Sequence, residues 1–229
     1  MNYDNLVNYY NKFNEDKRLT HRHGIVEYTT AMKYIHEYVG KESKILDVGA
    51  GCGAYSIPLS EEGHDVCAIE LIKHNLMALK GKNSAVKAYL GSAIDLSMFS
   101  DKSFDIALLF GPMYHLIKKE DKIKALIEAK RVLKDTGYIF VSYYMNDYAI
   151  INHGFIENTI LDDIDELNSI VDLKRVKILA QDGPSDYIRS TLNKMDDKTF
   201  DTYIKYHLSI CERKEMLGAS SHVLDILKK

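Results

Sequence analysis

The chain has 229 residues, of which 46% are hydrophobic and 28% are charged. This length and apolar content suffice for one hydrophobic core, so we expect a single domain over residues 1–229. Thirty Lys and Arg against 33 Asp and Glu give a net charge of −3, which argues against the basic surface that nucleic acid binding requires. A polar amino-terminal stretch and the lack of a long apolar run predict a cytoplasmic protein that does not contact a membrane.

The cysteines and the first 40 residues give the next expectations. Three cysteines without a CxxC pair predict reduced thiols and no structural zinc site. Two helices are predicted over residues 3–14 and 24–39, and the second carries apolar residues at helical spacing. We expect residues 1–40 to form an N-terminal helical cap.

From residue 44 the pattern alternates between strands and helices. The predicted strands are 44–48, 65–69, 86–90, 104–110 and 137–144, and the predicted helices are 54–62, 73–80 and 120–133. Such an alternation indicates a doubly wound α/β fold in which helices cover a parallel sheet. Residues 41–145 would form its ligand-binding core.

The last third of the chain is less regular. The pattern predicts a helix over 156–170, a strand over 174–180, a helix over 198–215 and an extended segment over 221–227. The two late strands could pair antiparallel at the sheet edge. The segment between them, about 40 residues, is longer than a common connection and is typical of a lid or binding insertion.

A glycine-rich loop follows the first predicted strand and runs directly into a helix. It reads Asp-Val-Gly-Ala-Gly-Cys-Gly over residues 47–53, and glycine permits both the sharp turn and the close approach of a ligand. The spacing Gly49-x-Gly51-x-x-Ala54 also matches a dinucleotide fingerprint. Asp47 favours a cofactor that carries an ammonium group, because a carboxylate there would repel a pyrophosphate. Glu70, at the end of the second strand, could accept hydrogen bonds from both hydroxyls of a ribose.

Four segments in this order resemble the class I S-adenosylmethionine-dependent methyltransferases. They are residues 45–53, residues 70–71, Gly-Ser-Ala-Ile-Asp-Leu over 91–96, and residues 103–116. The resemblance covers residues 45 to about 145. It implies a Rossmann-like, mostly parallel seven-stranded sheet with an antiparallel last strand, and S-adenosylmethionine as the cofactor.

The resemblance also implies roles for individual residues. Asp47 would bind the amino acid end of the cofactor, Glu70 the ribose hydroxyls, and Leu71 would pack on the adenine. The full set of implied cofactor residues is Asp47, Gly49, Ala50, Gly51, Gly53, Glu70, Leu71, Ser92, Ala93, Phe110 and Gly111. Ser92 stands where many relatives carry an acid, so the adenine contact would fall to its hydroxyl and the Ala93 backbone, while Asp95 could either bind or cap the loop.

Two neighbouring residues after the fourth strand are candidates for catalysis. His115 could act as a base because imidazole titrates near neutral pH, and Tyr114 lies beside it. Structural hydrogen bonding of His115 and packing of Tyr114 are the competing interpretations. The clustered oxygen ligands that a hard cation needs are missing after this strand, so we expect no metal.

The acceptor side is predicted from scattered residues. Candidates for a substrate pocket or lid are Tyr9, Tyr10, Arg22, Tyr28, Tyr143 and Tyr144, although strand alternation allows just one of the last two to face the pocket. We expect a small-molecule acceptor methylated on nitrogen or oxygen, and a monomer or homodimer. An NAD(P)-dependent oxidoreductase and a non-catalytic cofactor-binding module are the alternatives.

Overall fold

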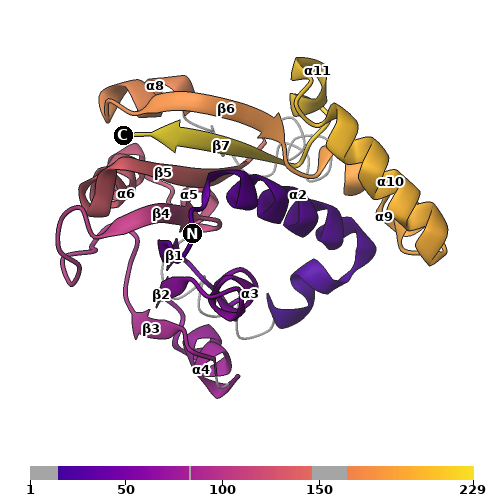
Figure 1. Cartoon of the computed structure of the whole chain (residues 1–229). Coiled ribbons are helices and arrows are strands. Elements are labelled where there is room, and N and C mark those ends of the chain that lie inside the picture. Colours follow the sequence, from indigo (N-terminus) through magenta and orange to yellow (C-terminus); the bar gives the residue numbers. More distant parts are fainter. Residues whose placement is uncertain (1–14, 83, 146–163) are drawn as a thin grey trace.

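The computed structural model describes residues 15–82, 84–145 and 164–229. In these residues seven strands form one sheet in the order β3-β2-β1-β4-β5-β7-β6 (Figure 1). The strands are β1 (Lys44–Val48), β2 (Asp65–Glu70), β3 (Lys87–Leu90), β4 (Phe104–Leu109), β5 (Leu133–Tyr144), β6 (Lys174–Ala180) and β7 (His222–Lys228). The strand pairs from β3 to β5 are parallel, whereas β7 lies antiparallel to both β5 and β6. The predicted doubly wound sheet with an antiparallel last strand is therefore confirmed.

Helices connect the strands and cover both faces of the sheet. In chain order they are η1 (Glu15–Thr20), α2 (Arg22–Tyr38), α3 (Ser56–Glu61), α4 (Lys73–Gly81), α5 (Pro112–His115), α6 (Lys119–Val132), α8 (Ile164–Ile170), η3 (Gly183–Ser185), α9 (Arg189–Leu192), α10 (Asp197–Ile210) and α11 (Lys214–Leu217). Within the described ranges, none of these helices is long and apolar enough to cross a membrane.

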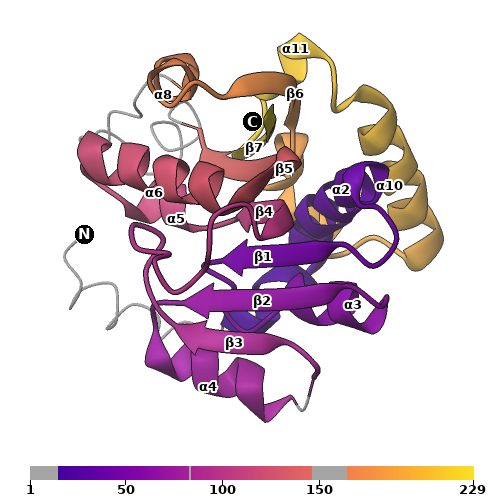
Figure 2. The same ribbon diagram turned by 60° about the vertical axis from the view of Figure 1, so that its left-hand side comes forward.

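The core divides at the sheet because successive strand residues point to opposite faces. Leu46 and Val48 of β1 pack in one cluster with residues of α6 and α8, whereas Ile45 packs in the other cluster with residues of α2 and α3. Figure 2 shows β1, β2 and β3 side by side with their arrowheads at the same edge of the sheet. The loops that leave these strands meet at this carboxyl edge, where ligands bind in open α/β sheets.

The antiparallel strand β7 brings a late part of the chain to the same edge. Tyr144, the last residue of β5, pairs with His222, the first residue of β7, and Ala180 at the end of β6 pairs with Val223. The chain therefore leaves β6 and enters β7 at the edge where the glycine loop lies.

The segment between β6 and β7 differs from the sequence prediction in detail. The helix predicted over 198–215 is two helices, α10 and α11, which are separated by residues 211–213. The Tyr34 hydroxyl donates to Glu212 Oε1 at 2.6 Å and lies 3.5 Å from Cys211 Sγ. Helix α2 therefore contacts the chain at the point where α10 ends. Both views show α10 beside α2 (Figure 1). The predicted helix 3–14 and residues 156–163 of the other predicted helix lie outside the described residues.

Candidate functional site

The glycine loop turns sharply at the end of β1. The Gly49 and Ala50 amides both donate to the Ile69 carbonyl, at 2.8 and 3.1 Å, which ties the loop to β2. Gly49 has φ +79°, and a Cβ on it would lie 2.9 Å from Cδ of Pro112. Glycine is therefore required here for its backbone angle and for the close packing of the loops after β1 and β4.

Two backbone amides hold the carboxylate of Glu70 against the glycine loop. The Gly51 amide donates to Oε2 and the Ile72 amide donates to Oε1, both at 2.7 Å. The side chain is 5% exposed. Two charge-assisted hydrogen bonds thus hold a buried acid at the carboxyl end of β2, in the place that the sequence predicts.

Asp47 is a second buried acid beside the loop. It is 2% exposed and accepts a short hydrogen bond from Ser56 Oγ, at the start of α3. Burial raises the pKa of Asp47 to about 7, and the nearby charge of Glu70 adds to this rise. A buried carboxyl with such a pKa gains from a cationic partner, because the partner would favour its charged form.

A small hollow lies over the loop. Its lining residues are Arg18, Leu19, Asp47, Gly49, Ala50, Gly51, Cys52, Ala54, Tyr55 and Phe110. It encloses about 30 Å³, whereas ligand pockets usually measure hundreds of Å³. Arg18 and Leu19 of η1 line this hollow, so η1 forms part of its wall.

The Tyr55 hydroxyl fits a ligand in this hollow. Tyr55 is 5% exposed, and its hydroxyl has no hydrogen-bond partner among the described residues. A buried hydroxyl without a partner costs free energy, and a polar ligand atom would remove that cost. Together with the two buried acids and the glycine turn, this supports the expected fit of a cofactor that carries positive charge.

A larger hollow of about 350 Å³ lies at the opposite edge of the sheet. It is lined by residues before β1 and at the start of β5, including Gly40, Ser43 and Lys134. This hollow lies at the amino ends of the parallel strands, whereas the glycine loop lies at their carboxyl ends. The smaller hollow is therefore the candidate site.

The segment after β3 forms a local turn. The Asp95 amide donates to the Ser92 carbonyl at 3.1 Å, and the Ser92 hydroxyl accepts from the Ile94 amide at 3.4 Å. Asp95 Oδ1 accepts from the Ser97 amide at 3.1 Å, so this acid caps the loop. Ala93 and Leu71 are half-buried. Their contacts with adenine stay a prediction, as does that of Ser92.

The segment after β4 lines the site from the other side. Phe110 packs edge-on against Tyr55, with ring centroids 4.8 Å apart. Gly111 has φ +144°, and a Cβ on it would lie 3.7 Å from the Tyr114 hydroxyl and 3.8 Å from the Gly49 carbonyl. Gly111 therefore lies close to both the Tyr114 hydroxyl and the glycine loop.

His115 is a weak candidate for a base. It is half-buried, and its ring lies 4.8 Å from that of Tyr114. Burial lowers its pKa to about 4. An imidazole with such a low pKa is neutral at pH 7 but has little affinity for a proton, which disfavours the predicted role.

The residues predicted to form a substrate pocket or lid lie in different parts of the structure. The ring of Tyr28 lies 5.4 Å from that of Tyr55, which lines the hollow, and the ring of Tyr144 lies 6.4 Å from that of Tyr114, both measured between centroids. Tyr143 is instead 2% exposed within the hydrophobic core, because strand alternation turns it away from Tyr144. Its predicted place in the pocket is wrong.

Arg22 also differs from the prediction. Its guanidinium pairs with Asp197 of α10 at 2.7 Å and lies 4.8 Å from the centroid of the Phe200 ring. It therefore joins α2 to α10 and does not line the hollow over the glycine loop. Tyr9 and Tyr10 lie outside the described residues.

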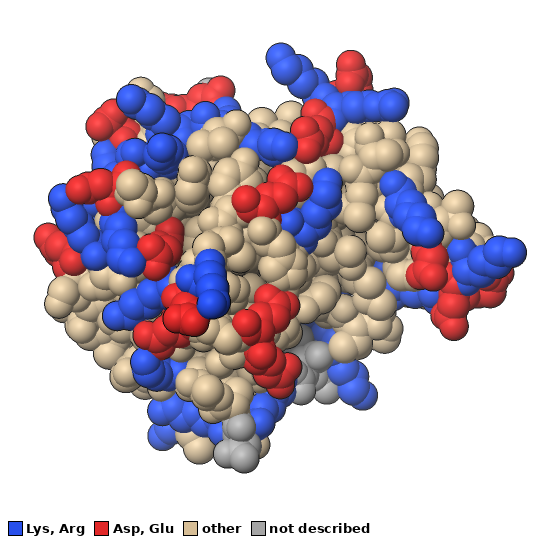
Figure 3. Space-filling view, viewed as in Figure 1, with Lys and Arg blue, Asp and Glu red and all other residues tan. Residues whose placement is uncertain are grey.

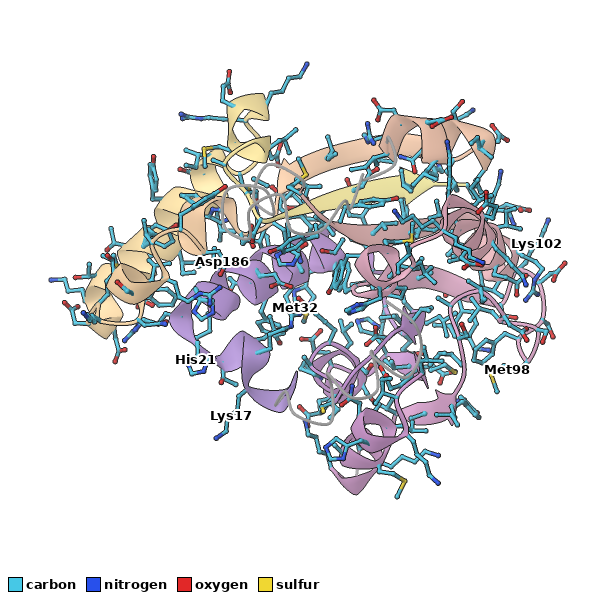
Figure 4. All side chains as sticks on the ribbon, turned by 180° about the vertical axis from the view of Figure 1, so that it is seen from behind. Lys17, His21, Met32, Met98, Lys102 and Asp186 are labelled. Carbon is cyan, nitrogen blue, oxygen red and sulfur yellow. The ribbon has the colours of Figure 1, made fainter. Side chains whose placement is uncertain are left out.

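The structure brings together a buried group that the sequence does not predict, which we call the His222 cluster: Glu27, Asp182 and His222. One ligand atom from each lies within 4.8 Å of the others. His222 Nδ1 is 2.8 Å from Asp182 Oδ2 and 3.9 Å from Glu27 Oε2. Arg18, which lines the hollow, pairs with Glu27 at 2.7 Å. Figure 4 labels Asp186, near the turn after β6 that carries Asp182, and Met32 on the adjacent α2.

Comparisons with known proteins agree with this geometry. Residues 46–141 match a family model described as a methyltransferase domain. The chain is 32% identical over 123 residues to an uncharacterized methyltransferase of Schizosaccharomyces pombe, which is 48% of this chain and 43% of that protein. It is 29% identical over 140 residues to the ubiquinone biosynthesis O-methyltransferase of Rickettsia typhi, which is 59% of this chain and 55% of that protein. The chain thus matches about half the length of these curated relatives.

Solved structures share the fold over most of the chain. A SAM-dependent methyltransferase from Archaeoglobus fulgidus superposes with a TM-score of 0.62 and 20% identity, covering 89% of this chain and 94% of that one. A putative sarcosine dimethylglycine methyltransferase from Galdieria sulphuraria gives a TM-score of 0.62 and 16% identity, covering 89% of this chain and 84% of that one. At these identities the likeness concerns the fold.

Proposed function

We propose that the chain transfers a methyl group from S-adenosylmethionine to a small molecule, since its core matches a methyltransferase domain model and shares its fold with SAM-dependent methyltransferases. The observation that carries the proposal is the pair of buried acids, Asp47 and Glu70, on either side of the glycine loop. The cofactor would supply a methyl group on a positively charged sulfonium. It also carries an ammonium, so two nearby carboxylates favour its binding.

The residues of the loop would divide the cofactor between them. Asp47 would pair with the ammonium and Glu70 would accept hydrogen bonds from the ribose hydroxyls. The loop itself supplies the close backbone approach, since Gly49 and Gly51 both have positive φ. A dinucleotide would bring its pyrophosphate toward Asp47, and the like charges would repel.

The surface and the aromatic rings support a small acceptor. Lys and Arg are interspersed with Asp and Glu over the face in Figure 3, which is unlike the single-sign surface of a nucleic acid-binding protein. The rings of Tyr55 and Phe110 line the hollow over the glycine loop, and the ring of Tyr28 packs near that of Tyr55. Apolar walls with a few polar groups are typical of small-molecule sites.

Calorimetric titration separates the proposal from its nearest alternative. The full chain is titrated with S-adenosylhomocysteine and, separately, with NAD and NADP. We expect S-adenosylhomocysteine to bind at micromolar concentration and the dinucleotides to bind at least about 100-fold more weakly. Preferential binding of a dinucleotide would contradict the proposal.

Turnover then separates an enzyme from a binding module. The chain is incubated with methyl-labelled S-adenosylmethionine and a panel of small alcohols, phenols and amines, and labelled products are counted. Label in a small acceptor supports the proposal. Tight binding of S-adenosylhomocysteine with no transfer to any member of a broad metabolite pool would indicate a non-catalytic module.

A further inference from the structure

The His222 cluster has the arrangement of an oriented base. His222 Nδ1 lies 2.8 Å from Asp182 Oδ2, so the imidazole donates its Nδ1–H to this carboxylate. In the part of the chain that the structure describes, Nε2 has no hydrogen-bond partner. The hydrogen bond therefore leaves Nε2 with the free lone pair, on the side of the ring away from Asp182.

Asp182 is built to stay ionised and to hold the ring. It accepts hydrogen bonds from Ser220 Oγ at 2.6 Å, from the Ser221 and His222 amides at 3.0 Å each, and from Ser221 Oγ. Burial raises the pKa of a carboxyl, but these donors and His222 outweigh it and hold the pKa of Asp182 below its usual range. A buried carboxylate with this many donors fixes the orientation of its histidine.

The charges around His222 favour proton acceptance. Burial lowers the pKa of the ring, but Glu27 and Asp182 outweigh it, so the net pKa is raised, although Arg18 opposes the rise. Tyr114 and Tyr144 are the titratable neighbours from α5 and β5, at 5.9 and 5.1 Å between ring centroids. Asp186 adds a further acid, 3.1 Å from Ser221 Oγ.

One tyrosine connects His222 to the cofactor side. The ring of Tyr114 packs edge-on to His222, and its hydroxyl lies near Gly111, the residue after Phe110, which lines the hollow over the glycine loop. Arg18 gives a second connection, because it lines the hollow over the glycine loop and pairs with Glu27. His222 thus lies at the carboxyl edge of the sheet, beside Tyr114 and close to Glu27, whose partner Arg18 lines the hollow.

We propose that His222 is the general base of the methyl transfer, that Asp182 positions it, and that the acceptor is a hydroxyl-bearing small molecule. This inference rests on the proposed function. The acceptor oxygen forms a bond to the methyl carbon, the sulfur keeps the electron pair of the broken C–S bond, and His222 Nε2 takes the hydroxyl proton. The resulting imidazolium is paired with the Asp182 carboxylate.

The chemistry of the acceptor follows from the presence of a base. A hydroxyl is a poor nucleophile until its proton is removed, whereas an amine needs merely to arrive unprotonated. An oriented and buried base is therefore expected for oxygen acceptors. His115, with its lowered pKa, is less suited to this step.

A metal ion is the competing occupant of the His222 cluster. The Asp182 carboxylate already accepts from two serines and from two groups of His222, and Glu27 is paired with Arg18. A cation would have to displace several of these donors. The hydrogen-bonded pair is therefore the better interpretation.

The first test needs no acceptor. In the full chain labelled with ¹⁵N-histidine, two-bond ¹H–¹⁵N spectra report the tautomer, and the His222 signal is assigned from its loss in His222→Asn. We expect the Nδ1–H tautomer with a basic Nε2 at pH 8, and a titration that moves to lower pH in Asp182→Asn. An Nε2–H tautomer, or a signal that shifts with micromolar Zn²⁺ or Mg²⁺, overturns the proposal.

The second test uses the acceptor panel. His222→Asn can keep the hydrogen bond to Asp182 while losing Nε2, and we expect kcat to fall at least about 100-fold for hydroxyl acceptors with the S-adenosylhomocysteine Kd within about twofold. In Asp182→Asn, kcat should fall about tenfold and the acid limb of its pH profile should move to lower pH, which a loss of packing alone would not cause.

The outcomes separate the two proposals. A wild-type chain that does not bind S-adenosylhomocysteine overturns the proposed function and leaves the tautomer result unchanged. Unchanged kcat in His222→Asn, loss of activity in His115→Asn but not in His222→Asn, or methylation confined to amines overturns the role of His222. If the acceptor panel yields no methylated product, the tautomer of His222 from the first test decides whether the proposed role of His222 stands.

Discussion

The two sides of the site are built from the chain in different ways. On the cofactor side, Gly51 and Glu70 are 19 residues apart and are joined by one hydrogen bond between consecutive strand ends. On the acceptor side, Asp182 and His222 are 40 residues apart, and Glu27 reaches them from the N-terminal helix α2. The first side is set by a local βαβ unit, whereas the second exists once the whole sheet has formed.

Because of this difference, the two sides of the site should tolerate different substitutions. The cofactor side depends on backbone geometry, so one added methyl group should disrupt it. The acceptor side depends on paired side chains, so isosteric changes of a charge should alter its chemistry without altering its shape. Single substitutions on each side and the pH dependence of binding test this contrast.

The largest effect is expected from Gly49→Ala. Its Cβ would lie 2.9 Å from the Pro112 ring, and its φ of +79° is unfavourable for alanine. We expect the affinity for S-adenosylhomocysteine to fall roughly 100-fold, which is about 2.7 kcal/mol. Calorimetric titration measures this.

Gly63→Ala is the matched control. Gly63 also has a positive φ, +95°, but a Cβ on it would meet nothing within 4 Å. Both variants should lose about 1 kcal/mol of folding stability through backbone strain. Equal affinities in the two variants would show that the close packing of Gly49 against Pro112 does not shape the cofactor site.

Glu70→Ala should have the next largest effect. It leaves the buried amides of Gly51 and Ile72 without their carboxylate, and it removes the acceptor for the ribose. We expect an affinity loss of roughly 30-fold, about 2 kcal/mol. Asp65→Ala is the control on the same strand, because its exposed side chain pairs with Lys87 at the other end of β2. A Glu70→Ala variant that binds as tightly as this control would remove the ribose role.

These cofactor-side residues could be predicted from the sequence for a physical reason. In a βαβ unit the loop after one strand and the end of the next strand are brought together by local connections, so Asp47, Gly49 and Glu70 can be placed from their spacing. Strand alternation likewise predicts that Tyr143 and Tyr144 face opposite sides. It could not tell which of them faces the site.

The acceptor side could not be predicted, because no local pattern marks it. Asp182 follows β6 in an irregular segment, and His222 reaches the carboxyl edge because β7 enters between β5 and β6 and runs antiparallel. His115 is a candidate in the sequence because it lies in the short segment that follows β4. The register of β7 with β5, which pairs His222 with Tyr144, is what makes His222 the better candidate.

A smaller effect is expected from pH on cofactor binding. The pKa of Asp47 is raised to about 7 by burial, so the carboxyl is mostly protonated at pH 6 and mostly ionised at pH 8. An ammonium pairs with the ionised form, so affinity should rise about tenfold between these pH values. Near pH 7 binding should release protons, which titrations in two buffers of different ionisation enthalpy detect.

The raised pKa of Asp47 has the opposite effect on folding stability, which falls as the pH rises. Because the folded pKa of Asp47 lies above its ordinary value of 3.8, ionisation of this carboxyl opposes folding, and the penalty grows as the pH rises from about 4 through 7. Asp47→Asn should therefore be more stable than wild type at pH 8 while binding the cofactor more weakly. A wild-type affinity that is flat from pH 6 to pH 8 would contradict the pairing of Asp47 with the ammonium.

The smallest effect is expected when the hydroxyl of either of two buried tyrosines is removed. The hydroxyls of Tyr55 and Tyr143 both lack a hydrogen-bond partner among the described residues, so Tyr55→Phe and Tyr143→Phe should each stabilise the unliganded chain by up to about 1 kcal/mol. For a chain of this size that is a rise of roughly 2–4 °C in Tm, measured by calorimetry. Tyr55 lines the hollow over the glycine loop, whereas Tyr143, on β5, lies in the hydrophobic core. Weaker ligand binding or slower turnover should therefore accompany the stabilisation in Tyr55→Phe and not in Tyr143→Phe, because a free hydroxyl is of use where a ligand can reach it.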